Sequence, residues 1–456
     1  MSNYLSTDLK DTICALATPG GTGAIGVIRI SGTEAIRVVD RLFKGKKLEQ
    51  QQSHTVHLGK IHDGDRVVDE VLATLFVSPR SYTGENTVEL SAHGSPYILQ
   101  EILQLLVKQG CRLAKPGEFT LRAFLNKKLD LSQAEAVADL IASSSSESHR
   151  TAMMQMRGGF SGQLTEMRER LVNFASLVEL ELDFAEEDVE FASRTELQSF
   201  VFKIRELVVS LLESFKYGNA IRNGIPTVIA GRPNAGKSTL LNALINDERA
   251  LVSAIAGTTR DTIEEAFVIE GITFRLIDTA GIRSHTADII EGMGIERTYE
   301  KIKQASIILY VYDASQTSAE ELIKELSAFE SMHAVVVPIA NKSDLLKASD
   351  ETFATAIQLS ARQKEGIEVL RKRLIEIVKQ DEVKNDIIIT NLRHYEALQH
   401  TFHALNDILD GIDQQISGEL LAFDIRRALH HLGLITGEVT TDDLLANIFS
   451  KFCIGK

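Results

Sequence analysis

The chain has 456 residues, which favours more than one domain and provides ample material for a hydrophobic core. Its 44% hydrophobic and 25% charged residues are typical of a soluble protein, and its net charge of −14 argues against broad electrostatic wrapping of nucleic acid, although a local basic site is compatible with it. The three cysteines, Cys14, Cys111 and Cys453, show no CxxC spacing and indicate neither a disulfide framework nor a zinc site. The N-terminus lacks a signal-peptide pattern and no uncharged apolar run reaches membrane-spanning length, so we expect a cytoplasmic protein without a membrane partner.

Residues 1–125 mix short strands and helices. Residues 24–30 and 71–77 are strand-like, and residues 98–106 follow an amphipathic helical pattern, so we expect a small α+β domain. Polar groups gather at its predicted loop edges, where ordinary turn chemistry is the simpler interpretation on composition alone. These groups lie in Tyr82-Thr-Gly-Glu85, Val88-Glu-Leu90, His93-Gly94 and Pro116-Gly-Glu-Phe119.

Residues 126–218 and 381–456 carry apolar side chains at helical spacing. The clearest stretches are 164–182, 200–215, 392–416 and 420–434, and the serine cluster at 143–146 is interpreted as a helix junction. His430 and His431 are adjacent and would point apart on a helix, which disfavours a metal site. The simplest architecture makes both segments one all-α domain.

The intervening segment contains Gly231-Arg-Pro-Asn-Ala-Gly-Lys-Ser238, which fits the phosphate-binding P-loop pattern G-x-x-x-x-G-K-[ST]. A strand-like stretch, 226–230, precedes it and a helical one, 239–245, follows, which is the context that the motif requires. The glycines let backbone N–H groups turn onto phosphate oxygens, and the helix N-terminus adds partial positive charge. We expect Lys237 to reach the β- and γ-phosphates and Ser238 to ligate Mg²⁺.

Three later motifs select the nucleotide. Asp278-Thr-Ala-Gly281 fits the DxxG loop that meets Mg²⁺ and the γ-phosphate, and Ser360-Ala361 suits the loop whose backbone N–H contacts guanine O6. Asn341-Lys-Ser-Asp344 has the NKxD form, whose aspartate accepts hydrogen bonds from guanine N1–H and N2–H₂ together, a pair that adenine lacks. The motifs predict a GTP site of Asn234, Ala235, Gly236, Lys237, Ser238, Thr239, Asp278, Thr279, Ala280, Gly281, Asn341, Lys342, Ser343, Asp344, Ser360, Ala361 and Arg362.

The expected architecture is an α/β P-loop GTPase domain (219–380) inserted into an all-α helical domain (126–218 plus 381–456) and preceded by an α+β domain (1–125). An inserted domain suits nucleotide-driven movement, because both of its linkers transmit a rotation.

Taken together, these motifs resemble one known family, the MnmE (TrmE) tRNA-modification GTPases. The resemblance rests on the P-loop, Gly257-Thr-Thr-Arg-Asp261, DTAG and NKSD, with Ala17-Thr-Pro-Gly20, PGEF, RAFLNKKLD (122–130) and the final ANIFSKFCIGK (446–456). It covers essentially the whole chain. It implies a homodimer that works with an FAD-dependent partner, MnmG (GidA), in a heterotetramer or larger complex. Together they would install a carboxymethylaminomethyl or aminomethyl group on C5 of the tRNA wobble uridine.

The resemblance also implies that the front domain binds 5-formyltetrahydrofolate. Carried over by motif, the folate contacts are Arg29, Glu89, Lys128 and the terminal Lys456. Cations suit the anionic glutamate tail of folate, and a carboxylate suits the amidine-like edge of its pterin. For Arg29 and Glu89, the alternative interpretation is an internal ion pair.

The residue after DTAG is Ile282, so the glutamine that orients water in Ras-like enzymes is absent, and no arginine finger is evident. The resemblance implies replacements: K⁺ held by Asn234, Ser253, Ile255 and Thr258, and Mg²⁺ held by Thr259 together with Ser238. Glu291, with Glu296 as the alternative, would be the catalytic residue that positions water, beside Lys237. The resemblance thus adds Ser253, Ala254, Ile255, Ala256, Gly257, Thr258 and Thr259 to the GTP site.

Cys453, beside Phe452 and Ile454, would ordinarily be a small buried hydrophobe. Chain ends usually fray, so an apolar and charged tail with a thiol is expected to dock on the rest of the chain. The resemblance places this tail beside the folate site, where Cys453 is a candidate catalytic residue. Covalent catalysis and a positional role both remain open.

Other functions share part of this pattern. A ribosome-assembly or translational GTPase uses the same four nucleotide motifs, but no appended basic RNA-binding module is visible. A one-carbon folate enzyme with a regulatory G domain is a second alternative. A membrane-remodelling GTPase is less favoured, because no lipid-facing basic amphipathic helix stands out.

Overall fold

The computed structural model describes residues 11–183, 193–245, 265–277, 304–329, 332, 334–345, 356–379 and 387–455. The chain divides into two compact units. The first consists of Met1–Ala138, Gln155–Asn173 and Leu429–Lys456, and the second of Asp139–Met154 and Phe174–Ala428. Within the described ranges, no helix has both the length and the apolar character needed to cross a membrane.

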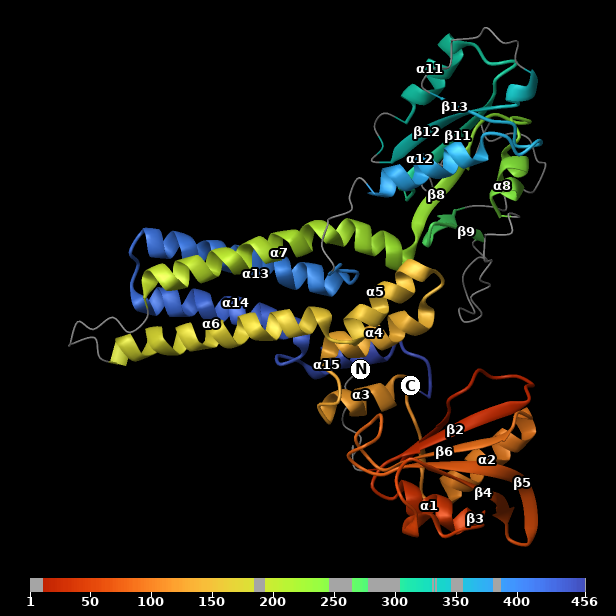
Figure 1. Ribbon diagram of the computed structural model, residues 1–456, viewed down its shortest axis with the longest axis vertical. Coiled ribbons are helices and arrows are strands. Elements are labelled where there is room, and N and C mark those ends of the chain that lie inside the picture. The colour runs from red at the N-terminus through yellow and green to blue at the C-terminus, as the bar shows by residue number, and fades with distance from the viewer. Residues whose placement is uncertain are drawn as a thin grey trace. The chain divides into compact units, whose positions relative to one another are not determined.

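The N-terminal part of the first unit is an α+β domain built on a seven-stranded sheet with the strand order β3-β4-β5-β6-β2-β1-β7 (Figure 1). Its elements are β1 (Ile13–Leu16), β2 (Ile25–Ser31), α1 (Ala35–Leu42), β3 (Phe43–Lys44), β4 (Thr55–Asp63), β5 (Arg66–Phe76), β6 (Thr87–His93), α2 (Pro96–Lys108) and β7 (Arg112–Leu113). Neighbouring strands are antiparallel except β1 and β7, which are parallel. The predicted strands at 24–30 and 71–77 and the helix at 98–106 are confirmed as β2, β5 and α2.

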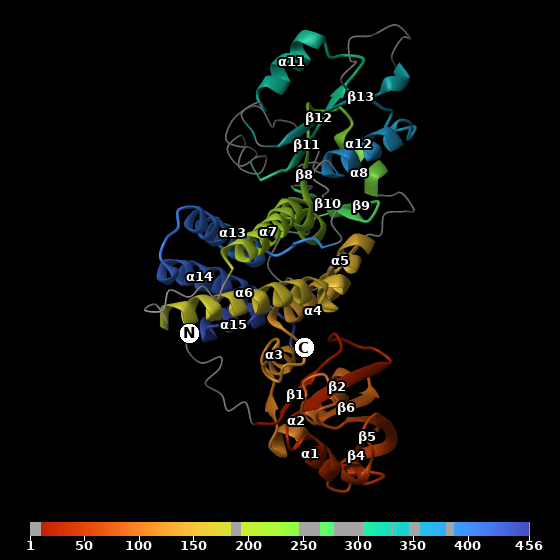
Figure 2. The same ribbon diagram turned by 60° about the vertical axis from the view of Figure 1, so that its left-hand side comes forward.

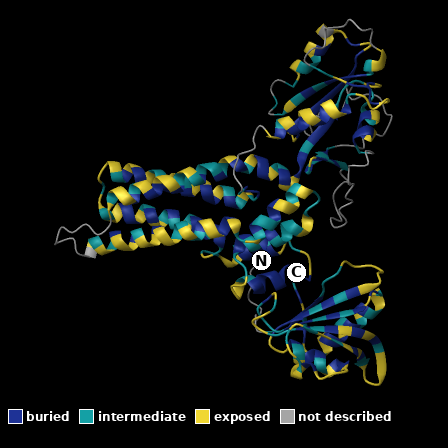
Figure 3. Cartoon of the chain, in the orientation of Figure 1, coloured by how far each residue is buried: buried dark blue, intermediate teal, exposed yellow. Residues whose placement is uncertain are grey.

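The two faces of this sheet differ in burial, and successive residues along β4 to β6 alternate between more buried and less buried positions over most of each strand (Figure 3). The face that carries Ile28, Ala73 and Leu90 is buried with α1 and α2 and forms the domain core. On the opposite face, directly paired residues form two rows across the strands. One row is Leu58, Leu72, Ser91 and Val27, and the other is Val56, Thr74, Glu89 and Arg29. Val56, Leu58 and Leu72 are exposed to 55%, 63% and 44%.

The first unit also brings the chain end to α3 (Glu118–Leu125). Phe449, the last residue of α15 (Asp442–Phe449), is buried with Leu121 and Leu131. Gly117 precedes α3 with φ of 65°, and a Cβ at this position would lie 2.6 Å from the Phe449 carbonyl oxygen. Glycine therefore permits both the turn and the close approach.

Helices before and after the G domain form the helical part of the chain: α4 (Leu131–Ala142), α5 (Ser146–Met156), α6 (Gly159–Asp183), α7 (Arg194–Asn223), α13 (Leu392–Asp413) and α14 (Gly418–Thr436). They confirm the four predicted helical stretches, and the serine cluster at 143–146 joins α4 to α5 as expected. In the second unit α7 and α13 lie side by side (Figure 2), and the rings of Phe215 and Tyr395 stack between them with centroids 4.4 Å apart.

The P-loop GTPase domain, or G domain, lies in the second unit and has a six-stranded sheet with the order β13-β12-β11-β8-β10-β9. In this sheet β9 runs antiparallel to β10, and the other neighbouring strands are parallel. Its elements are β8 (Ile225–Ala230), α8 (Lys237–Ile245), β9 (Glu265–Ile269), β10 (Ile272–Leu276), β11 (Ile307–Asp313), α11 (Ala319–Ser327), β12 (Val335–Asn341), β13 (Ile357–Gln358) and α12 (Ile367–Lys379). Strand β11 is buried along its whole length, which places it at the centre of the core. The chain thus has the expected fold class, a P-loop GTPase domain inserted into an all-α domain and preceded by an α+β domain.

The G-domain core includes side chains from the last turns of α7. Helix α7 continues to Asn223, five residues past the expected limit at 218, and Tyr217 and Ile221 of its last turns belong to the G-domain core. The reason is that the apolar periodicity of α7 serves two cores in succession. The division into 1–125, 126–218 plus 381–456, and 219–380 stays a prediction, since the two compact units cut across the helical part.

A glycine in α7 gives a test of this packing. A Cβ on Gly218 would lie 2.1 Å from the carbonyl oxygen of Ile389, whose N–H donates to Ser214 Oγ at 3.1 Å. A backbone oxygen cannot rotate away, so Gly218→Ala is expected to destabilise the second unit by about 1–3 kcal/mol, seen as a lower melting temperature in calorimetry. Gly162→Ala in α6 is the control, because a Cβ there meets nothing within 4 Å. Equal melting temperatures for the two variants would contradict the expectation.

Candidate functional site

The P-loop connects β8 to α8 with the backbone conformation that a phosphate-binding loop needs. Gly231 and Gly236 have φ of 137° and 95°, a region that L side chains rarely adopt. A Cβ on Gly231 would lie 1.9 Å from the Val311 carbonyl oxygen, and one on Gly236 would lie 2.1 Å from Asn341 Nδ2. Asn234 has φ of 61°, which asparagine tolerates better than most residues. The loop is therefore fixed by packing as well as by its own conformation.

Lys237 begins α8 and folds back onto the loop. Its Nζ donates to the carbonyl oxygens of Gly231 and Arg232, each at 2.8 Å. Burial lowers the pKa of Lys237. An anion bound next to Lys237 would oppose this shift, because it favours the charged form of the amine. A conformationally fixed cation inside a glycine loop, followed by Ser238 and Thr239 at a helix N-terminus, fits a nucleotide phosphate.

Asn341 at the end of β12 joins the two halves of the nucleotide site. Its Nδ2 donates to the Ala235 carbonyl oxygen at 2.7 Å, and its Oδ1 accepts the Ala361 backbone N–H at 3.0 Å. The residue is only 3% exposed. One buried amide therefore ties the P-loop to the loop predicted to contact guanine O6.

The turn that carries the other NKxD residues, Lys342 to Asp344, is bonded to Asp313 at the end of β11. Lys342 has φ of 62° and its Nζ contacts Asp313 Oδ2 at 2.6 Å, while Ser315 donates to Oδ1 of the same carboxylate through N at 3.0 Å and Oγ at 2.6 Å. Burial alone would raise the pKa of Asp313, but the hydrogen bonds from Lys342 and Ser315 and the charge of Lys342 hold it below its ordinary value. The charged carboxylate thus fixes the turn that presents Asp344, which is exposed.

The loop after β13 is closed by backbone hydrogen bonds. Ser360 N donates to the Glu365 carbonyl at 3.0 Å and Glu365 N to the Ser360 carbonyl at 3.2 Å. Ser343 N donates to the Leu359 carbonyl at 3.2 Å, which joins this loop to the NKxD turn. The structure therefore brings together the described nucleotide residues of three motifs, including Ala361 and the exposed Arg362.

The remaining predicted nucleotide and metal residues lie outside the described part of the chain. They are Ser253, Ala254, Ile255, Ala256, Gly257, Thr258, Thr259, Asp278, Thr279, Ala280, Gly281 and Glu291, with the alternative Glu296. Among the residues that are described, no group of three or more His, Cys, Asp or Glu side chains is arranged to hold a metal ion.

In the first unit, Arg29 and Glu89 lie opposite each other on β2 and β6. Arg29 Nε donates to Glu89 Oε1 at 2.8 Å, and the two side chains are 22% and 26% exposed. The guanidinium carbon also lies 5.5 Å from the ring centroid of Tyr82 and 5.7 Å from that of Phe119. The ion pair named as the alternative is present, and its partial exposure leaves both groups accessible to a ligand.

The C-terminal tail reaches this pair. The Gly455 carbonyl oxygen accepts a hydrogen bond from Arg29 Nη1 at 3.4 Å, and the Cys453 carbonyl accepts one from Gly117 N at 3.3 Å. A Cβ on Gly455 would lie 2.3 Å from the Leu16 carbonyl oxygen, so the tail packs backbone against backbone. The Cys453 thiol is exposed instead of being buried among apolar side chains, and Lys456 lies outside the described residues.

Lys128 contacts the loop between β5 and β6. Its Nζ donates to the Pro79 carbonyl oxygen at 3.1 Å, in the loop that carries Tyr82. This loop thus contacts Lys128 through Pro79 and Arg29 through Tyr82, and Arg29 also contacts Glu89 and Gly455.

Sequence reasoning did not single out the partners that organise these sites. It placed Asn341 in the GTP site without a contact to the P-loop, and it missed Tyr82 and Phe119 as neighbours of Arg29. Both aromatic residues lie in motifs that it did quote, YTGE and PGEF. An aromatic side chain beside turn residues was therefore the available signal.

Fold and site together define a P-loop protein that binds guanine nucleotides. The family described as "MnmE helical domain" matches residues 131–453, and "GTP-binding protein TrmE N-terminus" matches residues 12–128. A protein named tRNA modification GTPase MnmE from Cytophaga hutchinsonii is 54% identical over 100% of both chains, and one of the same name from Christiangramia forsetii is 53% identical over 98% of this chain and 100% of that one. The chain therefore belongs to the MnmE family of tRNA modification GTPases. The solved G domain of the T. maritima FeoB iron transporter is 24% identical over 33% of this chain and 97% of that one, with a TM-score of 0.25.

The bridging role of Asn341 yields a prediction. Asn341→Ala leaves the Ala235 carbonyl and the Ala361 N–H without their buried partner, so GDP affinity is expected to fall by about 10- to 100-fold in calorimetry. Asn223→Ala, which removes an exposed asparagine at the end of α7, is the control. A GDP affinity in Asn341→Ala that matches the control would show that the two loops hold their positions without the bridge.

Proposed function

We propose that this chain is a K⁺-activated GTPase that, with an FAD-dependent MnmG partner, modifies C5 of the tRNA wobble uridine with a one-carbon unit from tetrahydrofolate. Family membership carries the tRNA modification and GTPase part of the proposal. The observation that supports the one-carbon part is the Arg29–Glu89 pair, which lies partly exposed beside a docked, thiol-bearing chain end. We place the protein in the cytoplasm.

The chain's own residues divide the work on GTP. Lys237 binds the β- and γ-phosphates, Asp344 selects guanine, and the Asn341 bridge holds the two loops at a fixed separation. Glu291 positions the attacking water. Mg²⁺ held by Ser238 and Thr259, and K⁺ held by Asn234 with Ser253, Ile255 and Thr258, would neutralise charge on the phosphates when bound.

The four residues assigned to folate, here called the folate set, would contact both polar ends of the ligand. Arg29, Lys128 and Lys456 supply cations for the glutamate tail, and Glu89 supplies a carboxylate for the pterin edge. The tail residues 453–456 complete this set, because Gly455 already accepts a hydrogen bond from Arg29. The exposed thiol of Cys453 lies in the same tail, and it is the candidate for either covalent catalysis or a positional role in the modification of the uridine.

We further propose that the chain forms a homodimer through the outer face of the N-terminal sheet. Val56, Leu58 and Leu72 form an exposed apolar cluster there, which in a soluble protein marks an interaction surface. Arg29 and Glu89 lie in the same row of that face as Val56, so a partner subunit would border the folate set. MnmG would join this homodimer in a heterotetramer or larger complex.

K⁺ dependence gives the first functional test. The proposed K⁺ ion takes the place of an arginine finger, and the sequence has no Ras-type glutamine after DTAG. GTP hydrolysis is therefore expected to be about tenfold or more faster in K⁺ than in Na⁺. Asn234→Ala should lose that difference and still bind GDP, whereas Asn219→Ala on α7 should keep it. Equal rates of the intact protein in the two salts would refute K⁺ activation.

Folate binding is tested separately from hydrolysis. Arg29→Ala and Lys128→Ala are each expected to weaken 5-formyltetrahydrofolate binding about tenfold or more in calorimetry, because each removes a charged contact, with no change in GTP hydrolysis. Arg66→Ala is the control, since it removes an arginine of the same domain that is paired with Glu101. Unchanged folate affinity in both test variants would make Arg29–Glu89 an internal ion pair only.

The whole proposal is tested by nucleoside analysis of tRNA from a strain that lacks this gene. We expect loss of the modified wobble uridine, restoration by the wild-type gene, and no restoration by Cys453→Ser. A normal uridine profile with altered ribosomal particles would favour the alternative, a ribosome-assembly GTPase.

A further inference from the structure

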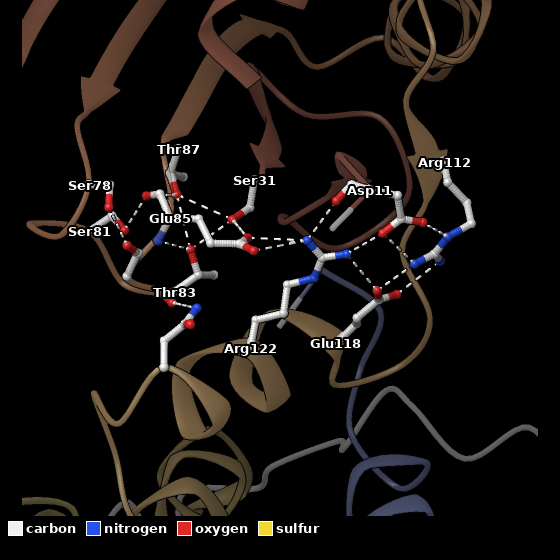
Figure 4. A network of polar contacts seen from close by, with 12 residues as sticks. Asp11, Ser31, Ser78, Ser81, Thr83, Glu85, Thr87, Arg112, Glu118 and Arg122 are labelled. Carbon is white, nitrogen blue, oxygen red and sulfur yellow. Dashed lines mark hydrogen bonds and ion pairs between the residues drawn. The ribbon is translucent and has the colours of Figure 1, made fainter. Parts of the chain in front are cut away.

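Arg122 of α3 is the centre of a buried polar network in the first unit (Figure 4). The residue is 1% exposed, yet its guanidinium meets three carboxylates. Nη1 donates to both carboxylate oxygens of Glu85 at 3.2 Å and to the Asp11 carbonyl oxygen at 2.8 Å. Nη2 donates to Asp11 Oδ1 at 2.6 Å and to Glu118 Oε1 at 3.1 Å. A buried cation with this many partners has one position only.

Of these partners, Glu85 belongs to the loop 77–86 between β5 and β6. On its other side Glu85 Oε2 accepts a hydrogen bond from Ser31 Oγ at 2.7 Å. Two further contacts join the loop to α3 and the residue after it: Tyr82 Oη to Thr120 Oγ1 at 2.9 Å, and Asn126 Nδ2 to the Thr83 carbonyl at 2.7 Å. The Arg122–Glu85 contact is the ionic one of these three, and charge-assisted contacts are the stronger kind.

The loop 77–86 positions two of the cations assigned to folate. The Tyr82 ring lies 5.5 Å from the Arg29 guanidinium, and the Pro79 carbonyl accepts from Lys128 Nζ at 3.1 Å. A shift of the loop against α3 would therefore move the surroundings of both cations together.

We propose that Arg122 is a positioning residue of the one-carbon site: through Glu85 it holds the loop 77–86 against α3 and thereby sets the spacing of Arg29 and Lys128 for a reduced folate. The inference rests on the proposed folate function. Arg122 touches neither cation, and it acts through the loop.

The other half of the network supplies a matched control. Arg112 donates through Nε to Asp11 Oδ2 at 2.6 Å and through Nη2 to Glu118 Oε1 at 2.5 Å, and none of these groups belongs to the loop 77–86. Burial would raise the pKa of Glu118, but the hydrogen bonds from Arg112 and Lys115 N and the charges of Arg112 and Arg122 hold that pKa below its usual value. Glu85 and Glu118 thus both accept hydrogen bonds from the Arg122 guanidinium, and of the two only Glu85 lies in the loop 77–86.

The experiment compares Glu85→Gln with Glu118→Gln in the full chain. Both keep the side-chain size and remove one charge from the same cluster. We expect Glu85→Gln to weaken 5-formyltetrahydrofolate binding about tenfold in calorimetry, the effect of losing one charged hydrogen bond, and Glu118→Gln to change it less than about twofold. Amide hydrogen exchange in the loop 77–86 should accelerate in Glu85→Gln alone, because the loop is released only there.

The outcomes separate this inference from the function on which it rests. Failure of the wild-type chain to bind the folate would remove the proposed one-carbon function and the inference with it. Binding by the wild type with equal losses in both variants, or with a loss in neither, would overturn the positioning role and leave the folate function intact. If Glu85→Gln does not fold, Ser31→Ala, which removes one hydrogen bond from the same carboxylate, replaces it under the same criteria.

Discussion

The docking of the chain's last residues on its N-terminal domain is the constraint on which the rest of the architecture depends. Gly455 packs against the backbone of Leu16 and accepts a hydrogen bond from Arg29, and Gly117 N binds the Cys453 carbonyl. Residues of α15 and the tail after it therefore share one compact unit with the N-terminal domain. Long helices precede the G domain in the chain and follow it, so the G domain is an insertion in the helical part.

The nucleotide site depends on close backbone approaches in a similar way. Gly231 and Gly236 have no room for a Cβ, and Asn341 fills the space beside Gly236 with an amide that bonds to both loops. These contacts fix the P-loop, the end of β12 and the loop after β13 relative to one another. The described nucleotide residues all lie in the second unit, whereas Arg29, Glu89 and Lys128 lie in the first.

Order and type of the elements could be predicted from the sequence, because apolar periodicity and the glycine and NKxD patterns are local. The P-loop strand and helix and the long α6, α7 and α13 are examples. Contacts between distant residues could not be predicted. Asn341 lies 106 residues from Ala235, and Arg122 lies 37 residues from Glu85, so no spacing rule relates them. The domain limit at 218 stays a prediction for a related reason, since the apolar face of α7 continues across that position into the G-domain core.

The most direct test of the central claim, that the docked tail completes the one-carbon site, uses a chain that lacks residues 453–456. Calorimetric titration with 5-formyltetrahydrofolate would be compared with the full chain, with GDP binding as the internal control. We expect the truncated chain to lose folate binding while its GDP affinity is unchanged, because the tail contacts Arg29 and the GTP site lies in the other unit. Undiminished folate affinity in the truncated chain would contradict the claim.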